Sequence, residues 1–397
     1  MKTYLLIFIL LSFFAFLEVL NVSKAKLKLL HYIVGLIFVF VAGLRYETGV
    51  DWYAYGEYFD SIAPFNEALI GGSFDKVFVT LDVGYALLNS VVKMLGGNIQ
   101  TIFFIVSLLT TTLLIKNLRK YTPYVLTGLL IYYTFFYFIF DMSGLRQGLA
   151  IQIVFYAIRF VETRNFRKYL VYILLATSIH WTAIILLPLY FLFNKQISQK
   201  LTIFIFLTCL IIFTFQIKWL EGILGDMLIR FNALSLLSDK INSYTINETL
   251  AKVRGWDLYS IYNFTRILFI VVVINKYKNK IRDHIQHVNI LYNFVIFELI
   301  CIFGLFEFLE ISERLKFYFA IAEIILLGSI IFLFRIKSRI VTLPIFVFVI
   351  ALNAYPFLLE VPSTIAYHPY QNYLFYKMFD LKSDGYQRLI QHAISHE

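Results

Sequence analysis

Three arginines at the edges of apolar segments could bind an anionic group. Arg45 follows one apolar segment, Arg146 begins another, and Arg314 lies at the start of a third. The planar guanidinium group of arginine forms paired hydrogen bonds with phosphate oxygens, so three such groups at one membrane boundary would suit a diphosphate. Two of them have simpler possible partners. Asp141 lies in the same turn as Arg146, and Glu310 lies one helical turn before Arg314.

A carboxylate and several aromatic side chains follow Arg45 in "GLRYETGVDWYAYGEYF", residues 43–59. Tyr46 and the later rings could stack on the apolar faces of sugars, and Asp51 could accept a proton from a hydroxyl group. The same rings could instead form the aromatic belt that anchors membrane proteins at the interface. Gln147, beside Arg146 in "FDMSGLRQGLA", is a further candidate for substrate binding.

His180 is the one histidine deep inside an apolar stretch, "LLATSIHWTAIILLP". A neutral imidazole could act as a general base, although a single buried histidine is more often a hydrogen-bonded packing residue. Arg266, Glu298 and Glu323 are expected ~10–12 Å inside the membrane, from their distance to the ends of their segments at about 1.5 Å per residue. Charges at that depth usually pair or serve function, so we expect Arg266 to pair with Glu298 or Glu323.

The sequence lacks the motifs that several classes of enzyme require. No HExxH, Walker, GxSxG or clustered His and Cys pattern occurs, and Cys209 and Cys301 have neither disulfide nor metal-site spacing. We therefore expect no metal and no cofactor.

The elements that would position these residues are membrane helices. Of the 397 residues, 60% are hydrophobic and 15% charged, and the apolar residues gather in blocks. A hydrocarbon core about 30 Å thick needs roughly 20 helical residues to cross it. We therefore predict an all-α polytopic membrane protein, a single integral membrane domain over residues 1–397. The predicted spans lie near 3–20, 29–44, 99–116, 123–140, 144–160, 201–217, 259–275, 288–306, 315–334 and 340–358.

The net charge of +10 is a signal of topology rather than of nucleic acid binding. Lysines and arginines cluster at the ends of apolar blocks, as in "KAKLK" at 24–28, and such clusters mark cytoplasmic loops. This places both termini outside, together with a first loop at 45–81, a large loop at 218–258 and a tail at 359–397. The large loop has balanced charges, so it could fold as a helical extracytoplasmic cap.

Two further apolar segments fit this threading poorly. Residues 82–96 cannot cross without moving the later basic loop to the wrong side, so we predict a partial or re-entrant helix. Residues 169–193 have basic flanks at both ends, which favours a helical hairpin that breaks near His180 over one tilted span. The total is then about 10–12 transmembrane or re-entrant helices, from the length needed to cross a bilayer.

The chain resembles the EpsG family of Wzy-like bacterial polysaccharide polymerases. The matching stretches are "GLRYETGVDWYAY", "GLRQGLA", "ATSIHWTAIILLP", "ERLKFYF" and "PYQNYLF", in this order over most of the chain. The family often has a small polar residue before the loop aspartate and tyrosine after it, whereas Val50 and Trp52 stand here. The exact sugar contacts of this loop therefore differ from the family pattern.

The resemblance implies a GT-C-like glycosyltransferase, related to O-antigen polymerases and ligases, that builds exopolysaccharide, capsule or O-antigen in the bacterial cytoplasmic membrane. Its substrate would be a polyprenyl-diphosphate-linked oligosaccharide on the outer face of the lipid bilayer, used without nucleotide sugar or metal. A chain-length regulator is a possible partner. The diphosphate and sugar ligands would be Arg45, Tyr46, Arg146, Gln147, Arg314 and Arg266, and the base His180 or Asp51.

Two other functions remain open. A flippase for lipid-linked oligosaccharides would need a charged cavity open to both sides, and an external acyltransferase could use His180 as its base. With seven prolines and no visible internal repeat, the sequence gives the flippase little support.

Overall fold

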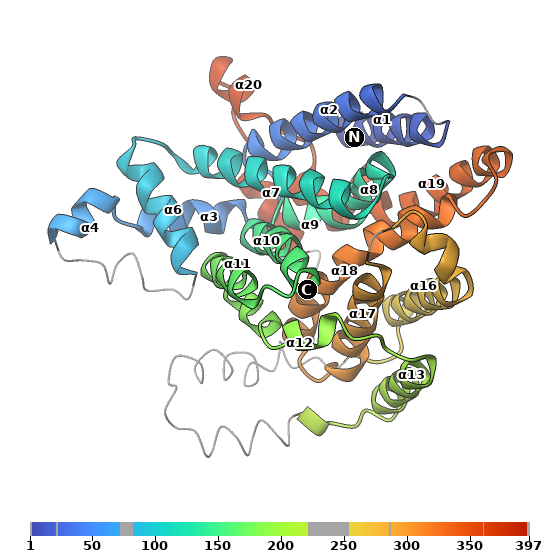
Figure 1. The fold of residues 1–397 in the computed structure, drawn as a ribbon. Helices are drawn as coiled ribbons and strands as arrows, with labels where there is room; N and C mark the ends of the chain where they lie inside the picture. The colour runs from blue at the N-terminus through green and yellow to red at the C-terminus, as the bar shows by residue number, and fades with distance from the viewer. Residues whose placement is uncertain are drawn as a thin grey trace, which may run out of the picture. The chain divides into compact units, whose positions relative to one another are not determined.

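The chain folds into helices throughout the part that the structure describes. The computed structural model describes residues 2–20, 23–71, 82–220, 254–285, 287–359 and 361–394. Within these ranges no strand forms, apart from an isolated bridge between Arg45 and Asn372, and the predicted all-α class is confirmed (Figure 1). Most of the predicted cap, residues 221–253, and residues 72–81 of the first loop lie outside the described residues.

Every predicted span corresponds to a helix, because each apolar block is rich in Leu, Ile and Phe and is bounded by polar residues. Four of these helices are long and apolar enough to cross a membrane, within Ala25–Gly43, Ile99–Tyr121, Leu258–Arg282 and Lys337–Leu358. In chain order the helices are α1 (Lys2–Val19), α2 (Lys24–Gly43), α7 (Ile99–Tyr121), α8 (Val125–Tyr132) with η1 (Tyr133–Tyr137) and α9 (Phe138–Phe140), α10 (Leu145–Glu162), α13 (Gln199–Thr214), α16 (Leu258–Arg282), α17 (Val288–Leu299) with η3 (Ile300–Gly304), α18 (Leu309–Ile331) and α19 (Ile336–Leu358).

The shorter elements lie between these spans. They are α3 (Trp52–Ser61), α4 (Phe65–Gly71), α6 (Val83–Met94), α11 (Phe166–Ile179), η2 (Trp181–Leu186), α12 (Tyr190–Phe193), η4 (Pro362–Tyr367), α20 (Tyr373–Met378) and α21 (Gly385–Ile394). Helix α6 has 12 residues. At 1.5 Å per residue it is about 18 Å long, too short to cross a bilayer, in agreement with the predicted partial helix.

The predicted hairpin near His180 is confirmed. Helix α11 ends at Ile179, and His180 takes extended dihedral angles (φ −148°, ψ 110°) before η2 begins. The hydroxyl of Tyr169, in the first turn of α11, donates to the carbonyl oxygen of Leu186 at 2.6 Å. This bond joins the start of α11 to the end of η2, so the chain doubles back at His180.

The contacts divide the chain into two compact units, residues 1–187 with 328–397 and residues 188–327. In the first unit α2 and α10 pack on α7, α11 packs on α10, and α1 packs on α8 (Figure 1). Gln100, at the start of α7, donates to the carbonyl of Gly43 at 2.7 Å, whereas Arg119, near its end, donates to His31 at 3.2 Å. These contacts are 19 residues apart, about 28 Å along the helix, so the unit spans about one bilayer thickness.

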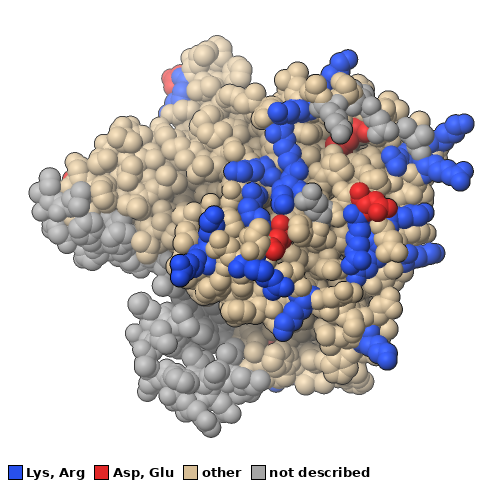
Figure 2. Space-filling model, in the orientation of Figure 1, with Lys and Arg blue, Asp and Glu red and all other residues tan. Residues whose placement is uncertain are grey.

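Basic side chains collect at one end of the first unit, which we call the basic end. Arg119 contacts the carbonyl of Lys28, and Lys120 lies 3.6 Å from Glu162, where α10 ends and Arg164 follows. Figure 2 shows lysine and arginine side chains, with few acidic ones, on the face that it views. In the first unit, the basic segments around Lys28, Arg119 and Arg164 lie together at the basic end.

The second unit is organised around aromatic packing and one buried ion cluster. Phe213 of α13 contacts Phe303 of η3 edge to face at 5.0 Å, and Phe264 of α16 contacts the same ring at 5.6 Å. Arg266 lies 2.8 Å from a carboxylate oxygen of Glu298 and 3.3 Å from one of Glu323. The predicted pairing of Arg266 is confirmed, and both glutamates take part.

Candidate functional site

Two of the motifs found in the sequence lie against each other at the opposite end of the first unit. The backbone N–H of Tyr46 donates to the carbonyl of Gln371 at 2.9 Å, and the N–H of Tyr373 donates to the carbonyl of Leu44 at 2.7 Å. Tyr46 also packs against the rings of Tyr373 and Tyr376, with ring centroids 5.8 and 5.5 Å away. "GLRYETGVDWYAY" and "PYQNYLF" therefore form one junction.

The turn before α10 completes this junction. Gly49 has φ +101°, and a Cβ placed on it would lie 2.1 Å from the carbonyl oxygen of Met142, so only glycine fits there without a shift of the backbone. The next residue, Val50, donates its N–H to the hydroxyl of Ser143 at 3.0 Å, and that hydroxyl lies 2.7 Å from the hydroxyl of Tyr367. The loop after α2 is thereby fixed against the turn that leads to Arg146.

Asp82 is the centre of the polar cluster beside this junction. Its side chain is buried, and one carboxylate oxygen accepts a hydrogen bond from Arg146 at 2.6 Å. The other oxygen accepts from the backbone N–H of Trp181 at 2.9 Å, and Nδ1 of His180 lies 3.9 Å from the first oxygen. The carboxylate of Asp82 thus joins three segments: the start of α6, the start of α10 and the break of the hairpin.

Three tyrosines surround the guanidinium group of Arg146. The group lies 5.7 Å from the ring centroid of Tyr55, 6.0 Å from Tyr58 and 5.7 Å from Tyr85. The side chain of Arg146 remains 34% exposed. It is therefore held in place by an acid and three rings, which attract a cation, while part of its surface stays open to a ligand.

Electrostatics keep Asp82 charged. Burial raises the pKa of this carboxyl, but the nearby imidazole of His180, the charge of Arg146 and the N–H of Trp181 outweigh it, so the pKa lies below its ordinary value. Asp82 precedes the short helix α6 and lies outside the predicted spans. At neutral pH the cluster therefore holds a carboxylate beside an arginine and a histidine.

Arg45 lies close to this cluster but has no exposed surface. Its guanidinium group stacks over Phe103 at 4.1 Å and donates to the carbonyl oxygens of Ala42 at 2.7 Å and Asp141 at 3.0 Å. Phe103 in turn contacts Tyr55, a ring that also faces Arg146. In this conformation Arg45 supports the wall behind Arg146, and a ligand would reach it only if the loop opened.

The pairing of Asp141 with Arg146, considered as an alternative from the sequence, does not occur in the structure. Arg146 bonds to Asp82, whereas the carboxylate of Asp141 accepts a hydrogen bond from the hydroxyl of Tyr132 at 2.5 Å. The two residues are close in sequence, but they point into different surroundings.

The other candidates from the first unit lie on the elements around the cluster. Asp51 is the residue that begins α3. Burial raises the pKa of Tyr55, Arg146 opposes this rise and Asp51 adds to it, so the Asp51 carboxylate acts on the same ring as Arg146. Gln147 follows Arg146 in the first turn of α10 and is partly buried.

Arg314 and Arg266 belong to the second unit, which is described by itself. Arg314 donates to Glu310, the partner that the helical spacing allows, and its side chain is 34% exposed. Arg266 lies between Glu298 and Glu323, two glutamates with almost no exposure. Among the described residues, no three His, Cys, Asp or Glu side chains gather where they could hold a metal ion.

Asp82 was missed from the sequence. It stands directly after a stretch without clear periodicity and has no partner within a helical turn, because its contacts lie 64 and 99 residues away. One signal could have found it: an acid at the start of a short apolar segment that was already predicted to be re-entrant.

A comparison with known protein families decides which family the chain represents. The family described as the EpsG family matches residues 28–374. The chain belongs to the EpsG family. Four of the five motifs on which the resemblance rested fall within the matched residues, and the fifth does so except for its last residue, Phe375. This family links the chain to polysaccharide biosynthesis in a membrane. Neither the curated proteins nor the solved structures gave a match.

Proposed function

We propose that this EpsG-family protein is a glycosyltransferase that joins polyprenyl-diphosphate-linked oligosaccharide units on the extracytoplasmic face of the bacterial cytoplasmic membrane. The observation that carries the proposal is the setting of Arg146, which is held by Asp82 and three tyrosines while a third of its side chain stays open. A fixed, partly desolvated guanidinium group is a suitable binding site for a diphosphate.

The donor diphosphate would bind to the open edge of Arg146. As the bond between the sugar C1 and the diphosphate oxygen breaks, negative charge grows on that oxygen, and a fixed cation stabilises it without reorganisation. The tyrosines around Arg146, and Tyr46 with its ring neighbours, offer apolar faces for sugar rings. Gln147 supports the same donor from the next position of α10.

His180 is the favoured base for the acceptor. Its Nδ1 faces Asp82, so a proton on that nitrogen would orient the ring and make Nε2 the basic nitrogen. Because His180 is buried, the acceptor hydroxyl would reach Nε2 only if the cluster opened. The hydroxyl oxygen attacks C1, its proton passes to Nε2, and the electron pair of the broken bond leaves with the diphosphate. Asp51, on the loop that borders the cluster, is the second candidate for this role.

The arrangement of the two ends of the first unit supports the proposed extracytoplasmic location. The cluster lies at the end where Gln100 contacts Gly43, opposite the basic end around Arg119. Basic ends of membrane proteins face the cytoplasm. The site would then open toward the outer leaflet, where the proposed lipid-linked substrate would be present.

We propose a different role for each of three arginines outside the open site. We retain Arg314 as a second diphosphate ligand, because its pair with Glu310 leaves a third of its side chain exposed. Arg45 acts as a positioning residue, since it is fully buried behind Tyr55 and Phe103. Arg266, listed with the substrate ligands from sequence, is fully engaged by two glutamates and we propose a structural part for it.

The decisive experiment replaces Arg146. We expect Arg146→Ala to lower chain growth ~10²- to 10³-fold, the usual effect of removing one donor that stabilises transition-state charge. Lipid-linked single repeats would accumulate while the amount of protein stays normal. Arg146→Lys keeps the charge without the planar fork and should recover only part of the activity. The measurement is the ladder of chain lengths in a host that lacks its own polymerase.

Arg159→Ala is the matched control, because Arg159 lies on the same helix but at the basic end, stacked over Tyr156 at 3.5 Å. It should keep a normal ladder. Purified protein with lipid-linked repeat units separates the rival functions. Chain growth supports polymerisation, movement of the lipid without bond formation would replace it with a flippase, and dependence on an acyl donor would replace it with an acyltransferase.

A further inference from the structure

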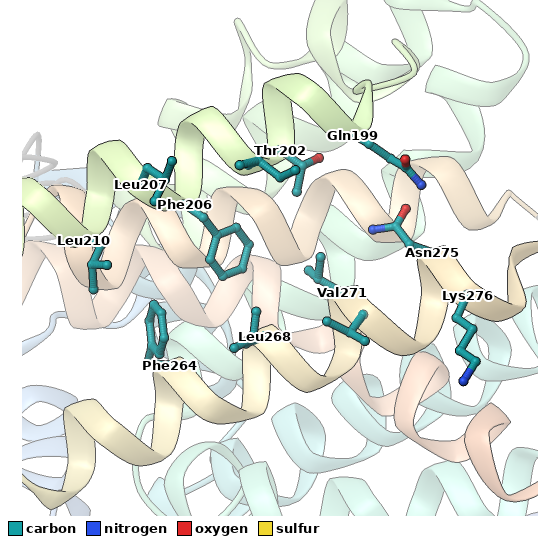
Figure 3. A pocket seen from close by; sticks show the side chains of 12 residues that line it. Gln199, Thr202, Phe206, Leu207, Leu210, Phe264, Leu268, Val271, Asn275 and Lys276 are labelled. Carbon is teal, nitrogen blue, oxygen red and sulfur yellow. The ribbon is translucent and has the colours of Figure 1, made fainter.

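A lateral groove separates α13 from α16 in the second unit. Its volume is about 610 Å³, and its lining comes from these two helices alone (Figure 3). Both helices pack against η3 or α17 instead of against each other along their length. The groove therefore opens sideways, toward the surface on which exposed apolar side chains such as Ile203 and Val272 lie.

The groove is polar at one end and apolar along the rest. Gln199 and Lys276 lie at the polar end, and Leu210 and Phe264 lie at the other, as Figure 3 shows. The lining of α13 runs from Gln199 to Leu210, and the distance between these residues along the helix is about 17 Å. One leaflet of a bilayer has a hydrocarbon depth of about 15 Å. The apolar length therefore matches a single lipid chain in one leaflet.

Specific contacts hold the two walls apart and fix the floor. At the polar end, the hydroxyl of Tyr292 on α17 lies 2.9 Å from the hydroxyl of Thr202 and accepts from the amide of Asn275 at 3.1 Å. At the apolar end, the rings of Phe206 and Phe264 lie 6.1 Å apart and close the groove. The spacing of α13 and α16 is thus set by side chains at both ends.

The charge at the polar end is positive. Lys276 is exposed and lines this end of the groove, and its ammonium group lies 5.5 Å from the ring centroid of Tyr277. Further basic residues stand in the same parts of the two helices or just before α13: Lys195, Lys200, Lys278, Lys280 and Arg282. Such a mouth complements a phosphate group with net negative charge better than a zwitterionic headgroup.

We propose that this groove binds one anionic phospholipid. Its acyl chain lies between Phe206 and Leu268, and its phosphate contacts Lys276 with the amide of Gln199 beside it. The lipid comes from the leaflet at the basic end of the helices, which the positive-inside rule assigns to the cytoplasm. This site is independent of the proposed polymerase activity, because it shares no residue with the cluster around Arg146.

A second groove, between α2 and α7, shows why we select this one. It is also apolar and also ends at basic residues, Lys116 and Arg119. There, however, Arg119 already donates to His31 and to the hydroxyl of Tyr32. In the α13–α16 groove, by contrast, Lys276 stands exposed at the mouth.

The test uses the full-length protein in detergent, offered phosphatidylglycerol and phosphatidylcholine with identical acyl chains in equal amounts. Native mass spectrometry counts the lipids retained. We expect one phosphatidylglycerol per chain in preference to phosphatidylcholine. Lys276→Gln should lower that preference about fivefold, the effect of one lysine at a membrane surface. Leu268→Trp fills the groove and should lower the retention of both lipids.

Lys382→Gln is the matched control, since Lys382 is exposed, belongs to the first unit and does not line the groove. It should retain phosphatidylglycerol as the unchanged protein does. Equal retention of the two lipids by the unchanged protein would overturn the proposal, and so would an undiminished preference in Lys276→Gln. Because both lysines are exposed, circular dichroism and gel filtration should show the same folded protein in every case.

Discussion

Asp82 joins the two groups that the proposed chemistry needs. It pairs with Arg146 at 2.6 Å and lies 3.9 Å from His180, and its lowered pKa keeps it charged. A carboxylate in this position holds the guanidinium group still and favours the protonated form of the imidazole after it has taken a proton. In the proposed reaction the residue would therefore act on both the donor side and the acceptor side without touching either substrate.

The role of Asp82 can be tested through pH. Because its pKa is lowered, its ion pair with Arg146 persists as the pH falls and is lost only when the pH passes through that lowered value. In Asp82→Asn the imidazole of His180 loses the carboxylate, so it is harder to protonate. We expect initial rates of chain growth to fall about 100-fold, and the acid limb of the pH profile to move to lower pH.

Asp60→Asn is the control for this measurement, because Asp60 lies exposed at the end of α3. Its rate and pH profile should equal those of the unchanged protein. If Asp82→Asn kept its acid limb at the original pH, His180 would not be a base oriented by Asp82, and Asp51 would take its place in the proposal.

Arg314 offers a second test at the scale of single residues. Arg314 already has a structural role in its ion pair with Glu310, and the test asks whether it also contacts a ligand. An exposed ion pair contributes about 0–1 kcal/mol, and its loss alone should leave activity nearly unchanged. We therefore expect Glu310→Gln to polymerise normally and Arg314→Ala to accumulate single repeats. Equal chain-length ladders in the two variants would show that Arg314 only pairs with Glu310 and does not bind the diphosphate.

At the scale of elements, the spans were predictable and the breaks were only partly so. The apolar block 99–116 ends at basic residues and the block 340–358 directly follows them, so composition alone locates α7 and α19. The break at His180 was predicted from basic residues on both flanks of one block. What the sequence did not reveal is that η2 returns along α11 and presents the N–H of Trp181 to Asp82, since that contact joins residues 99 positions apart.

The junction between loops was predictable only as a set of motifs. Gly49 could be assigned to a turn, but nothing local indicates that the carbonyl of Met142 approaches it so closely. Likewise, Arg45 and Arg146 have the same residue type and similar positions beside a span, yet one is fully buried and the other is 34% exposed. Burial depends on which helices pack alongside, and this is decided by tertiary contacts.

At the scale of the whole chain, the proposals share one requirement, which is orientation in the membrane. The first unit has its polar cluster at one end and its basic residues at the other, about one bilayer thickness away along α7. The polymerase needs the cluster outside, where the lipid-linked units are, and the lipid groove needs the basic end of its helices inside.

Labelling of single cysteines measures that orientation. The native Cys209 and Cys301 are both buried, so they give little background. Ser61, exposed at the end of α3, and Thr163, exposed between α10 and α11, mark the two ends of the first unit. With a thiol reagent that does not cross membranes, Ser61→Cys should react in intact cells, and Thr163→Cys only after permeabilisation. The reverse pattern would put the Arg146 cluster in the cytoplasm, where the proposed substrate does not occur, and would remove the polymerase proposal.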